Sequence, residues 1–454
     1  MKQILLIIFL FSVTACTAQE SVGTKDKEIV FRSVNVIPMD KESVLQNRVV
    51  VVKNGKITAI GAPEKTKWSK DALVIDAKGK YLMPGLAEMH AHVPPVDDLE
   101  PMKEVLLLFA ANGVTTIRGM LGHPRHLELR SKIQSGEILG PRFFTSGPSF
   151  NGQSTPTPEK AIPMVRQQKE AGYDFLKLHP GLTKETFAAL TQTAKEVGIP
   201  FAGHVSFDVG IWRAIEAGYA TIDHLDGFVE SLVPGIEDIG EQKMGLFALF
   251  VGDQADTTRI PKLITGLRNH NIWVVPTQSL AERWFSPGRS VEVLRNEPEM
   301  IYMAPNTVNN WVNTKTNLLN NPAYNSAAVN RFIQLRRKLI YECNKNGVGL
   351  LLGSDAPQVF DVPGFSVHHE LRYLVDAGLS PYEALRTGTV NVARFYRQPD
   401  WGVIKEGAVA DLILLNGNPL ANIDETRNIE GVLLNGRWLS KNWIKDQLKS
   451  LEKK

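Results

Sequence analysis

Two histidines one residue apart, His90 and His92, end the apolar run that begins at Leu82. In a β-strand the side chains of residues i and i+2 point to the same face of the sheet. Both imidazoles would therefore project together from the end of a strand, as two ligands of a metal such as Zn²⁺ must. The pair alone could also be ordinary surface or core histidines, so a metal site needs further ligands elsewhere in the chain.

Four more polar residues lie at or near the ends of later apolar runs, and together with the first pair they could build one site. Each has a structural alternative when taken alone. Lys177 could pair with Asp174 at the surface, Asp355 could cap a helix, and either later histidine could be a core residue. The complete set is far more specific than any of its members. The four residues are Lys177, His204, His224 and Asp355.

Short apolar runs alternate with helical stretches through the middle of the chain, from about residue 84 to 395. Counting the run before His90, the pattern predicts eight strand–helix steps and therefore an α/β fold, a TIM-like (β/α)8 barrel. Active sites of such barrels lie at the carboxyl ends of the strands, where the six polar residues fall. The other expected strands are residues 115–117, 143–145, 175–178, 200–204, 220–222, 273–275 and 348–352, and expected helices include 101–112, 183–197, 210–217 and 330–346.

Both ends of the chain are rich in β-branched residues and turns. Asn54-Gly55 and Asn435-Gly436 are strong signals for two-residue hairpins between such runs. The simplest assembly is a small β-sandwich domain built from both chain ends, with the barrel inserted between them. We assign residues 28–83 and 396–454 to this composite β-sandwich and residues 84–395 to the barrel.

The first 15 residues have the pattern of a signal peptide, with Lys2 followed by an apolar stretch too short to span a membrane. The small residues before Cys16 resemble the lipobox of bacterial lipoproteins, which implies lipidation of Cys16. Residues 16–27 would be a polar tether. We therefore expect an exported protein on the periplasmic or cell-surface side, anchored to the membrane by lipid. Plain secretion with cleavage near Ala15 or Ala18 is the alternative.

The composition narrows the classes of partner. The 454 residues carry a formal net charge of +3 with the charges well mixed, which gives no reason to expect a nucleic-acid partner. The only cysteines are Cys16 and Cys343, so a disulfide framework and a cysteine metal site are both excluded. The expected partner is a small-molecule substrate, and the sequence is compatible with a homo-oligomer.

The order and spacing of these motifs resemble the amidohydrolase superfamily, in particular its binuclear branch related to prolidases and imidazolonepropionases. The similar segments run from about residue 50 to 422, nearly the whole mature chain. They include Met83-Pro84-Gly85-Leu86 before the first histidine pair, Asp174-Phe175-Leu176-Lys177, Gly203-His204, Ile222-Asp223-His224, Gly353-Ser354-Asp355-Ala356 and Gly407-Ala408-Val409-Ala410-Asp411-Leu412.

The resemblance implies a site for two divalent metal ions, with zinc the expected metal. His90, His92, Lys177 and Asp355 would hold one ion, and Lys177, His204 and His224 the other. Lys177 would act as a carbamate formed with CO₂, because a neutral or cationic lysine is a poor ligand. A hydroxide bridging the two metals would attack the substrate, and Asp355 would be the catalytic residue that moves its proton.

The implied reaction is hydrolysis of an amide or peptide bond, as in a dipeptide or an N-acyl amino acid. The same site could act on a lactone, carbamate or phosphotriester, or on an amidine in a deamination. Deaminases of the superfamily usually place a glutamate a few residues after the fifth-strand histidine, whereas His204 is followed by Val-Ser-Phe-Asp. A non-catalytic metal-binding lipoprotein is the third alternative, and the complete ligand set argues against it.

Some further residues give weaker signals. His179 lies two residues after Lys177 and could contact substrate. Arg118 could bind a substrate carboxylate or tie the barrel together, and Gly119 follows it where relatives often carry an acidic residue. His126 is expected to be solvated.

Overall fold

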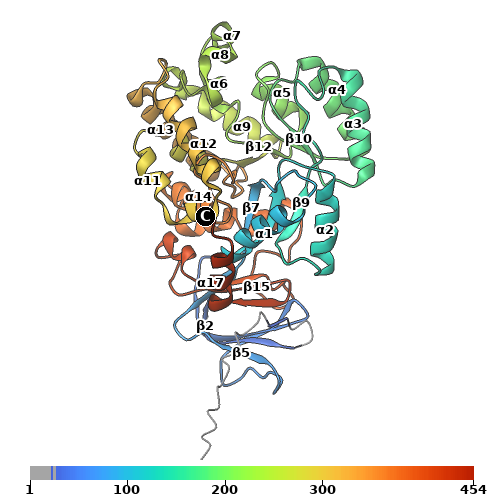
Figure 1. Cartoon of the computed structure of the whole chain (residues 1–454), viewed down its shortest axis with the longest axis vertical. Helices are drawn as coiled ribbons and strands as arrows, with labels where there is room; N and C mark the ends of the chain where they lie inside the picture. The colour runs from blue at the N-terminus through green and yellow to red at the C-terminus, as the bar shows by residue number, and fades with distance from the viewer. Residues whose placement is uncertain (1–21, 24–26, 454) are drawn as a thin grey trace, which may run out of the picture.

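A computed structural model describes residues 22–23 and 27–453. The predicted signal peptide, Cys16 and most of the predicted tether lie outside the described residues. Within the described ranges, no helix combines the length and hydropathy that a membrane span requires. A β-sheet forms one end of the molecule, and the parallel strands with their helices form the rest (Figure 1).

Strands from both ends of the chain form one nine-stranded sheet, in the order β1-β16-β15-β14-β6-β2-β3-β4, with β5 paired to β2. The two halves join where β14 pairs antiparallel with β6, Leu412 opposite Pro84 and Leu415 opposite Tyr81. In Figure 1 the N-terminal strands are blue and the C-terminal strands red. The strands are β1 (Val22–Gly23), β2 (Ile29–Val36), β3 (Leu45–Lys53), β4 (Lys56–Gly61), β5 (Leu73–Asp76), β6 (Tyr81–Pro84), β14 (Leu412–Leu415), β15 (Ile429–Leu434) and β16 (Arg437–Ser440).

The core of this sheet contains side chains from both ends of the chain. Phe31 of β2 packs edge to face on Trp438 of β16, with ring centroids 5.4 Å apart. At both predicted hairpins the asparagine and the glycine have positive φ, as in Asn54 (50°) and Gly55 (71°). This is the conformation that type I′ turns require and that Asn-Gly adopts readily. Packing and hydrogen bonding thus join the two chain ends into one module.

The middle of the chain forms two parallel sheets, β7-β8-β9 and β10-β11-β12-β13. Parallel bridges connect the segment after β9 to the β10 region, at Ser146–Phe175 and Phe150–Leu178, and link Val274 of β13 to Leu350. The segment after Leu350 returns to the first strand, where the Met89 N–H donates to the Leu352 carbonyl at 2.8 Å. The predicted α/β fold is therefore confirmed. The strands are β7 (Leu86–Ala91), β8 (Val114–Gly119), β9 (Arg142–Thr145), β10 (Leu176–Leu178), β11 (Phe201–Gly203), β12 (Thr221–Asp223) and β13 (Trp273–Val275).

Helices follow the parallel strands, and several begin and end as their sequences predict. Thr183 caps the first turn of α4 by accepting from the Thr186 N–H, and Gly198 ends that helix with φ 66°. The eighth predicted strand, 348–352, differs from the prediction because it makes a single bridge at Leu350 and no continuous ladder. The main helices are α1 (Glu100–Ala111), α2 (Arg125–Ser135), α3 (Pro158–Ala171), α4 (Lys184–Val197), α5 (Gly210–Ala217), α9 (Ile260–Asn269), α13 (Ser326–Lys345), α14 (Phe365–Asp376), α15 (Pro381–Thr387), α16 (Val390–Phe395) and α17 (Lys441–Ser450).

Two insertions follow β12 and β13, where loops of an α/β fold carry function. The first contains the short helices labelled α6 to α8 near one extremity of Figure 1, and the second contains the helices α11 and α12. Their elements are α6 (Phe228–Leu232), α7 (Ile236–Ile239), α8 (Glu241–Met244), η1 (Leu246–Ala248), η2 (Gly252–Gln254), η3 (Thr257–Arg259), α10 (Gln278–Leu280), η4 (Ala281–Phe285), α11 (Val291–Arg295), η5 (Pro298–Tyr302), α12 (Pro305–Leu319) and, near the chain end, η6 (Ile423–Arg427).

His126 of α2 is buried, whereas the sequence predicted a solvated residue. Its Nε2 lies 3.1 Å from the Pro94 carbonyl oxygen. Burial lowers the pKa of His126 from 6.5 to about 4. Between these two values only the unfolded chain takes up the proton, so acidification favours unfolding. From pH 6.5 to 4, this side chain should remove up to about 3 kcal/mol from the free energy of unfolding.

Urea denaturation at the two pH values tests this expectation. His126→Gln should lose less stability than the wild type on acidification, although it is less stable at neutral pH. The exposed His270 provides the matched control, since His270→Gln should retain the wild-type dependence. Equal slopes for His126→Gln and the wild type would contradict the expectation.

Candidate metal centre

The six predicted ligands lie at the carboxyl ends of five segments of the parallel strands. His90 belongs to β7 and Lys177 to β10, while His92, His204 and His224 follow β7, β11 and β12 directly. Asp355 belongs to the segment that continues past Leu350 and has φ 70°. Its N–H donates to the His90 carbonyl at 3.0 Å, so the backbone itself places this carboxylate beside the first strand.

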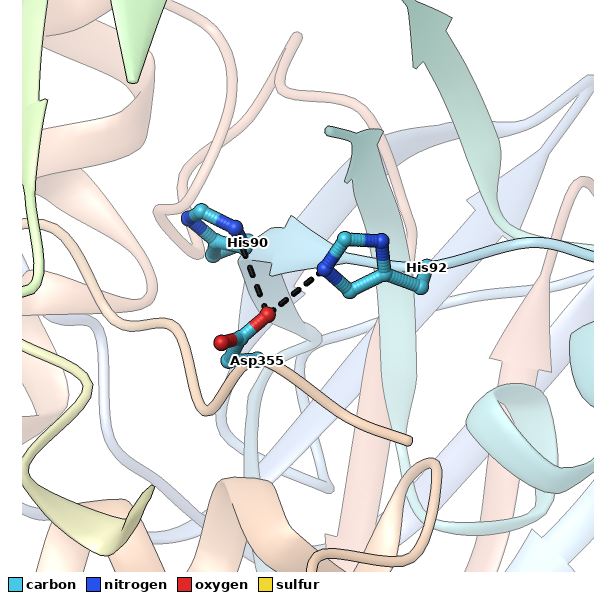
Figure 2. Close-up of side chains that lie close together, drawn as sticks. All are labelled: His90, His92 and Asp355. Carbon is cyan, nitrogen blue, oxygen red and sulfur yellow. Dashed lines mark hydrogen bonds and ion pairs between the residues drawn. The ribbon is translucent and has the colours of Figure 1, made fainter. Parts of the chain in front are cut away.

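His90, His92 and Asp355 converge on one point (Figure 2). The Asp355 Oδ1 atom lies 2.6 Å from His92 Nε2 and 3.3 Å from His90 Nε2. The two imidazoles come from positions two residues apart at one strand end, and the carboxylate comes from the adjacent segment (Figure 2). The i, i+2 geometry predicted for the two histidines is therefore present.

The other three predicted ligands continue the same cluster. The Lys177 Nζ atom is fully buried and lies 3.4 Å from His90 Nε2. The ring of His224 has its centroid 4.4 Å from that of His90 and 4.5 Å from that of His204. Its Nδ1 lies 3.8 Å from Asp355 Oδ2. All six side chains thus form one connected group.

The chemistry of this group fits a divalent metal. The His224 Nε2 atom is buried and has no hydrogen-bond partner among the described residues, which is costly unless something else occupies that nitrogen. Burial lowers the pKa of His224 well below 6.5 and that of His204 to about 3. Both rings are therefore neutral at physiological pH, as a metal-binding imidazole must be. Imidazole and carboxylate donors together suit Zn²⁺ and similar ions.

Each of three candidate ligands is oriented through its second ring nitrogen. His204 Nδ1 makes a hydrogen bond with Asp226 Oδ2 at 3.0 Å, and His90 Nδ1 pairs with Asp223 Oδ2 at 2.8 Å without the alignment of a hydrogen bond. Metal-binding histidines commonly contact a carboxylate in this way. The sequence reasoning missed both aspartates as positioning residues, although they flank His224 in the chain and this proximity was an available signal.

Thr277 orients the third ring, with its Oγ1 2.9 Å from His224 Nδ1. The residue follows β13 with φ 46° and lies 53 positions from His224, so no local pattern could have identified it. We expect Thr277→Val, which keeps the branched shape and removes the hydroxyl, to weaken metal affinity about 10- to 100-fold.

Competition with a chromogenic chelator measures this affinity. Thr426→Val is the matched control, because Thr426 Oγ1 makes the same contact with His368 Nδ1, at 3.0 Å, outside the cluster. Its affinity should equal that of the wild type. An unchanged affinity in Thr277→Val would show that this hydroxyl does not position a ligand.

Glu88 fixes the segment that carries the candidate catalytic carboxylate. Its carboxyl group accepts hydrogen bonds from the Ser354 N–H at 2.8 Å and the Ser354 hydroxyl at 2.6 Å. It also accepts from the His90 N–H at 3.1 Å. One buried side chain therefore joins the backbone next to His90 to the residue before Asp355.

Arg118 lies inside the strands, and its guanidinium is only 2% exposed. It donates to the Met89 carbonyl at 2.7 Å and to Thr221 Oγ1 at 3.0 Å, and it pairs with Asp223 at 3.4 Å. These contacts join β8, which carries Arg118, to β7 and β12. They favour the structural role predicted for Arg118 over the prediction that it binds substrate.

His179 lies beside the cluster, with its ring centroid 5.1 Å from that of His204. Burial lowers its pKa to about 2, so the ring is neutral. Its contact with substrate stays a prediction.

A second group of acidic residues and a histidine lies close together at Glu297, Glu299 and His369, but its members are paired with other side chains. His369 Nε2 lies 2.7 Å from Glu299, and Arg427 contacts the other ring nitrogen at 2.8 Å. Glu297 pairs with Arg283 and Arg289. Both ring nitrogens have partners and the carboxylates face arginines, so this group is a network joining the second insertion to α14 and η6.

Comparison with known proteins places the chain in a family. The model of the amidohydrolase family matches residues 81–439, which include all six candidate ligands. The chain belongs to the amidohydrolase family. This amidohydrolase is 47% identical to a 5′-deoxyadenosine deaminase of Methanosarcina acetivorans over 66 residues, only 14% of this chain and 15% of that protein.

Two solved structures are similar over most of their length. A Xaa-Pro dipeptidase with bound methionine in the active site is 20% identical, with a TM-score of 0.65, over 91% of this chain and 100% of that chain. Bottromycin amidohydrolase is 21% identical, with a TM-score of 0.68, over 93% of this chain and 89% of that chain. At these identities the likeness establishes the fold.

Proposed function

We propose that this amidohydrolase is a metal-dependent hydrolase that cleaves an amide or peptide bond in a small substrate, such as a dipeptide or an N-acyl amino acid. The observation that carries the proposal is the convergence of His90, His92 and Asp355 with a buried lysine and two further histidines. A similar fold in a Xaa-Pro dipeptidase supports this choice of bond.

Two divalent metal ions, with zinc the expected metal, would be held by the six ligands in the two sets that the family resemblance implies. Bound metals supply Lewis acidity and make a water molecule acidic enough to attack near neutral pH. Lys177 is suited to carbamate formation because burial lowers its pKa from 10.5 to about 8, which leaves part of the amine neutral and able to react with CO₂.

Asp355 is the proposed proton carrier. Its carboxylate points into the cluster at 2.6 Å from His92, and its backbone is fixed by the His90 carbonyl and by Glu88 through Ser354. In this position it can accept a proton from the attacking water and deliver it to the leaving nitrogen. A rigid backbone keeps the carboxylate aligned through both transfers.

The wider organisation of the protein is part of the proposal. We propose that residues 84–395 form a closed (β/α)8 barrel, supported by the bridges at Phe175, Leu178 and Leu350, and that residues 28–83 and 396–454 form the second domain. We also propose export and lipidation at Cys16. Incorporation of labelled palmitate should be lost in Cys16→Ser.

Deamination of an amidine is the second candidate, favoured by the short match to 5′-deoxyadenosine deaminase. The residues after His204 do not include the early glutamate that the deaminases usually carry. A screen of dipeptides, N-acyl amino acids, lactones and adenosine analogues, with Asp355→Asn as the blank, decides between them. We expect activity on amides that the blank lacks. Ammonia release from the adenosine analogues alone would replace the proposal with the second candidate.

A further inference from the structure

A cavity of about 950 Å³ opens beside His204. One wall is the stretch from His204 into α5, and the other is the first insertion, from Asp226 to Phe247. Its inner end is therefore formed by a candidate metal ligand and by the aspartate that orients it. The volume lies within the range of small-molecule binding sites.

Exposed charged residues line part of this cavity, namely Lys184, Asp208, Arg213, Glu237, Glu241 and Arg259, whereas its buried side chains are mostly apolar. The apolar side chains come from both walls and from the short helices α6 to α8, and all of them are buried. They are Val205, Ile211, Val233, Ile236, Met244 and Phe247. Transfer of an apolar group from water to this buried apolar part of the cavity is favourable, whereas a charged group placed against it would lose its hydration.

Phe247 connects this apolar surface to the metal centre. Its ring lies nearly parallel to those of His224 and His204, at centroid distances of 5.4 and 6.3 Å. The residue has φ 55° and ψ 31°, a left-handed conformation that a phenylalanine rarely adopts and that packing must maintain. The first insertion thus holds this ring against the two candidate ligands.

The mouth of the cavity also presents large apolar side chains. Trp212 is 37% exposed and Leu246 is 44% exposed. Burial raises the pKa of Glu230, which also lines the cavity, to about 8, so this carboxyl group is mostly uncharged at neutral pH. Apolar side chains therefore line the cavity from its mouth to the metal centre, beside the exposed charged residues.

We infer that this cavity binds a bulky apolar group of the substrate, such as a leucine or phenylalanine side chain next to the bond that is cleaved. The inference deepens the proposed hydrolase function and rests on it. Glycine-containing substrates would leave the cavity empty, and the expected preference in kcat/KM for the bulky apolar group is at least about tenfold.

Paired substrates that differ only in this group test the inference. The two exposed residues at the mouth can be changed without disturbing the core. Leu246→Asp should lower kcat/KM about tenfold for the leucine substrate and leave kcat/KM for the glycine substrate nearly unchanged. Trp212→Ala should also reduce the preference for the leucine substrate. Val293→Asp, at an exposed apolar position in α11 away from the cavity, should behave as the wild type.

Binding measured without turnover separates this inference from the hydrolase proposal. By calorimetry, Asp355→Asn should bind N-acetyl-leucine at least about tenfold more tightly than N-acetylglycine, and adding Leu246→Asp should abolish the difference. Equal affinities, or a Leu246→Asp effect of the same size on both ligands, would overturn the inference. A retained difference in affinity without amide hydrolysis in the screen would overturn the hydrolase proposal alone.

Discussion

Asp355→Asn should lower kcat by about 100- to 10,000-fold with a small change in KM. Asparagine has nearly the same shape as aspartate, so the backbone hydrogen bond from residue 355 to the His90 carbonyl and the one from Ser354 to Glu88 remain available. The amide cannot accept a proton from the attacking water, and general acid–base catalysis contributes about this factor. The loss therefore falls on the chemical step rather than on substrate binding.

Metal content must be measured beside the rate, because Asp355 is also a candidate ligand. At saturating metal the rate deficit should persist. Asp411→Asn provides a matched change of a partly buried aspartate that pairs with Arg142 at 3.1 Å, outside the site, and it should keep the wild-type kcat. If metal saturation restores Asp355→Asn to full activity, Asp355 is only a ligand and the proton-transfer role is wrong.

The candidate ligands could be predicted from the sequence because their positions follow from local rules. The spacing of His90 and His92 fixes their common face once the segment is a strand. His204 and His224 each come directly after a short buried strand, so parallel pairing must bring them to one edge. The two-residue periodicity of a strand and the assumption that the strands pair in parallel were enough to predict that these residues lie together.

Asp223 and Asp226 lie close to His224 in the sequence, but the contacts of Thr277 and Arg118 could not be found by the same rules. Thr277 reaches His224 across 53 positions, and Arg118 reaches Asp223 across 105 positions. Such contacts depend on which strands become neighbours in the folded protein, and the sequence around a threonine or an arginine does not say which strand its side chain will contact. Packing also decides why residues 348–352 do not form a continuous strand. Their backbone makes separate hydrogen bonds to Val274, Met89 and Thr387 instead of a ladder with one neighbouring strand.

Lys177→Ala should cause the largest loss of bound metal. Lys177 is fully buried against His90, so an alanine leaves no group that could bridge between the two sets of candidate ligands. Two metals held close together require an anionic bridge to offset their repulsion. We expect metal content per chain, measured by elemental analysis, to fall well below half of the wild-type value. Formate or acetate should partly restore it by occupying the emptied position.

Lys315 offers a control of the same chemistry in a different environment. It is also fully buried, and burial lowers its pKa to about 8, as for Lys177. Its Nζ donates to the carbonyls of Arg283, Trp284 and Ser286, which end η4, so it acts as a helix cap. Lys315→Ala should lower stability and leave metal content unchanged.

A carbamate on Lys177 would have a separate signature. Protein equilibrated with ¹³C-bicarbonate should show a carbamate resonance that is absent in Lys177→Ala and retained in Lys315→Ala. Because the reaction needs the neutral amine, the resonance should form more slowly as the pH falls below about 8. Full metal content in Lys177→Ala, or the same resonance in both variants, would show that Lys177 is not the bridge. In that case a neutral lysine amine beside His90 would need another explanation, and the binuclear arrangement would lose its central ligand.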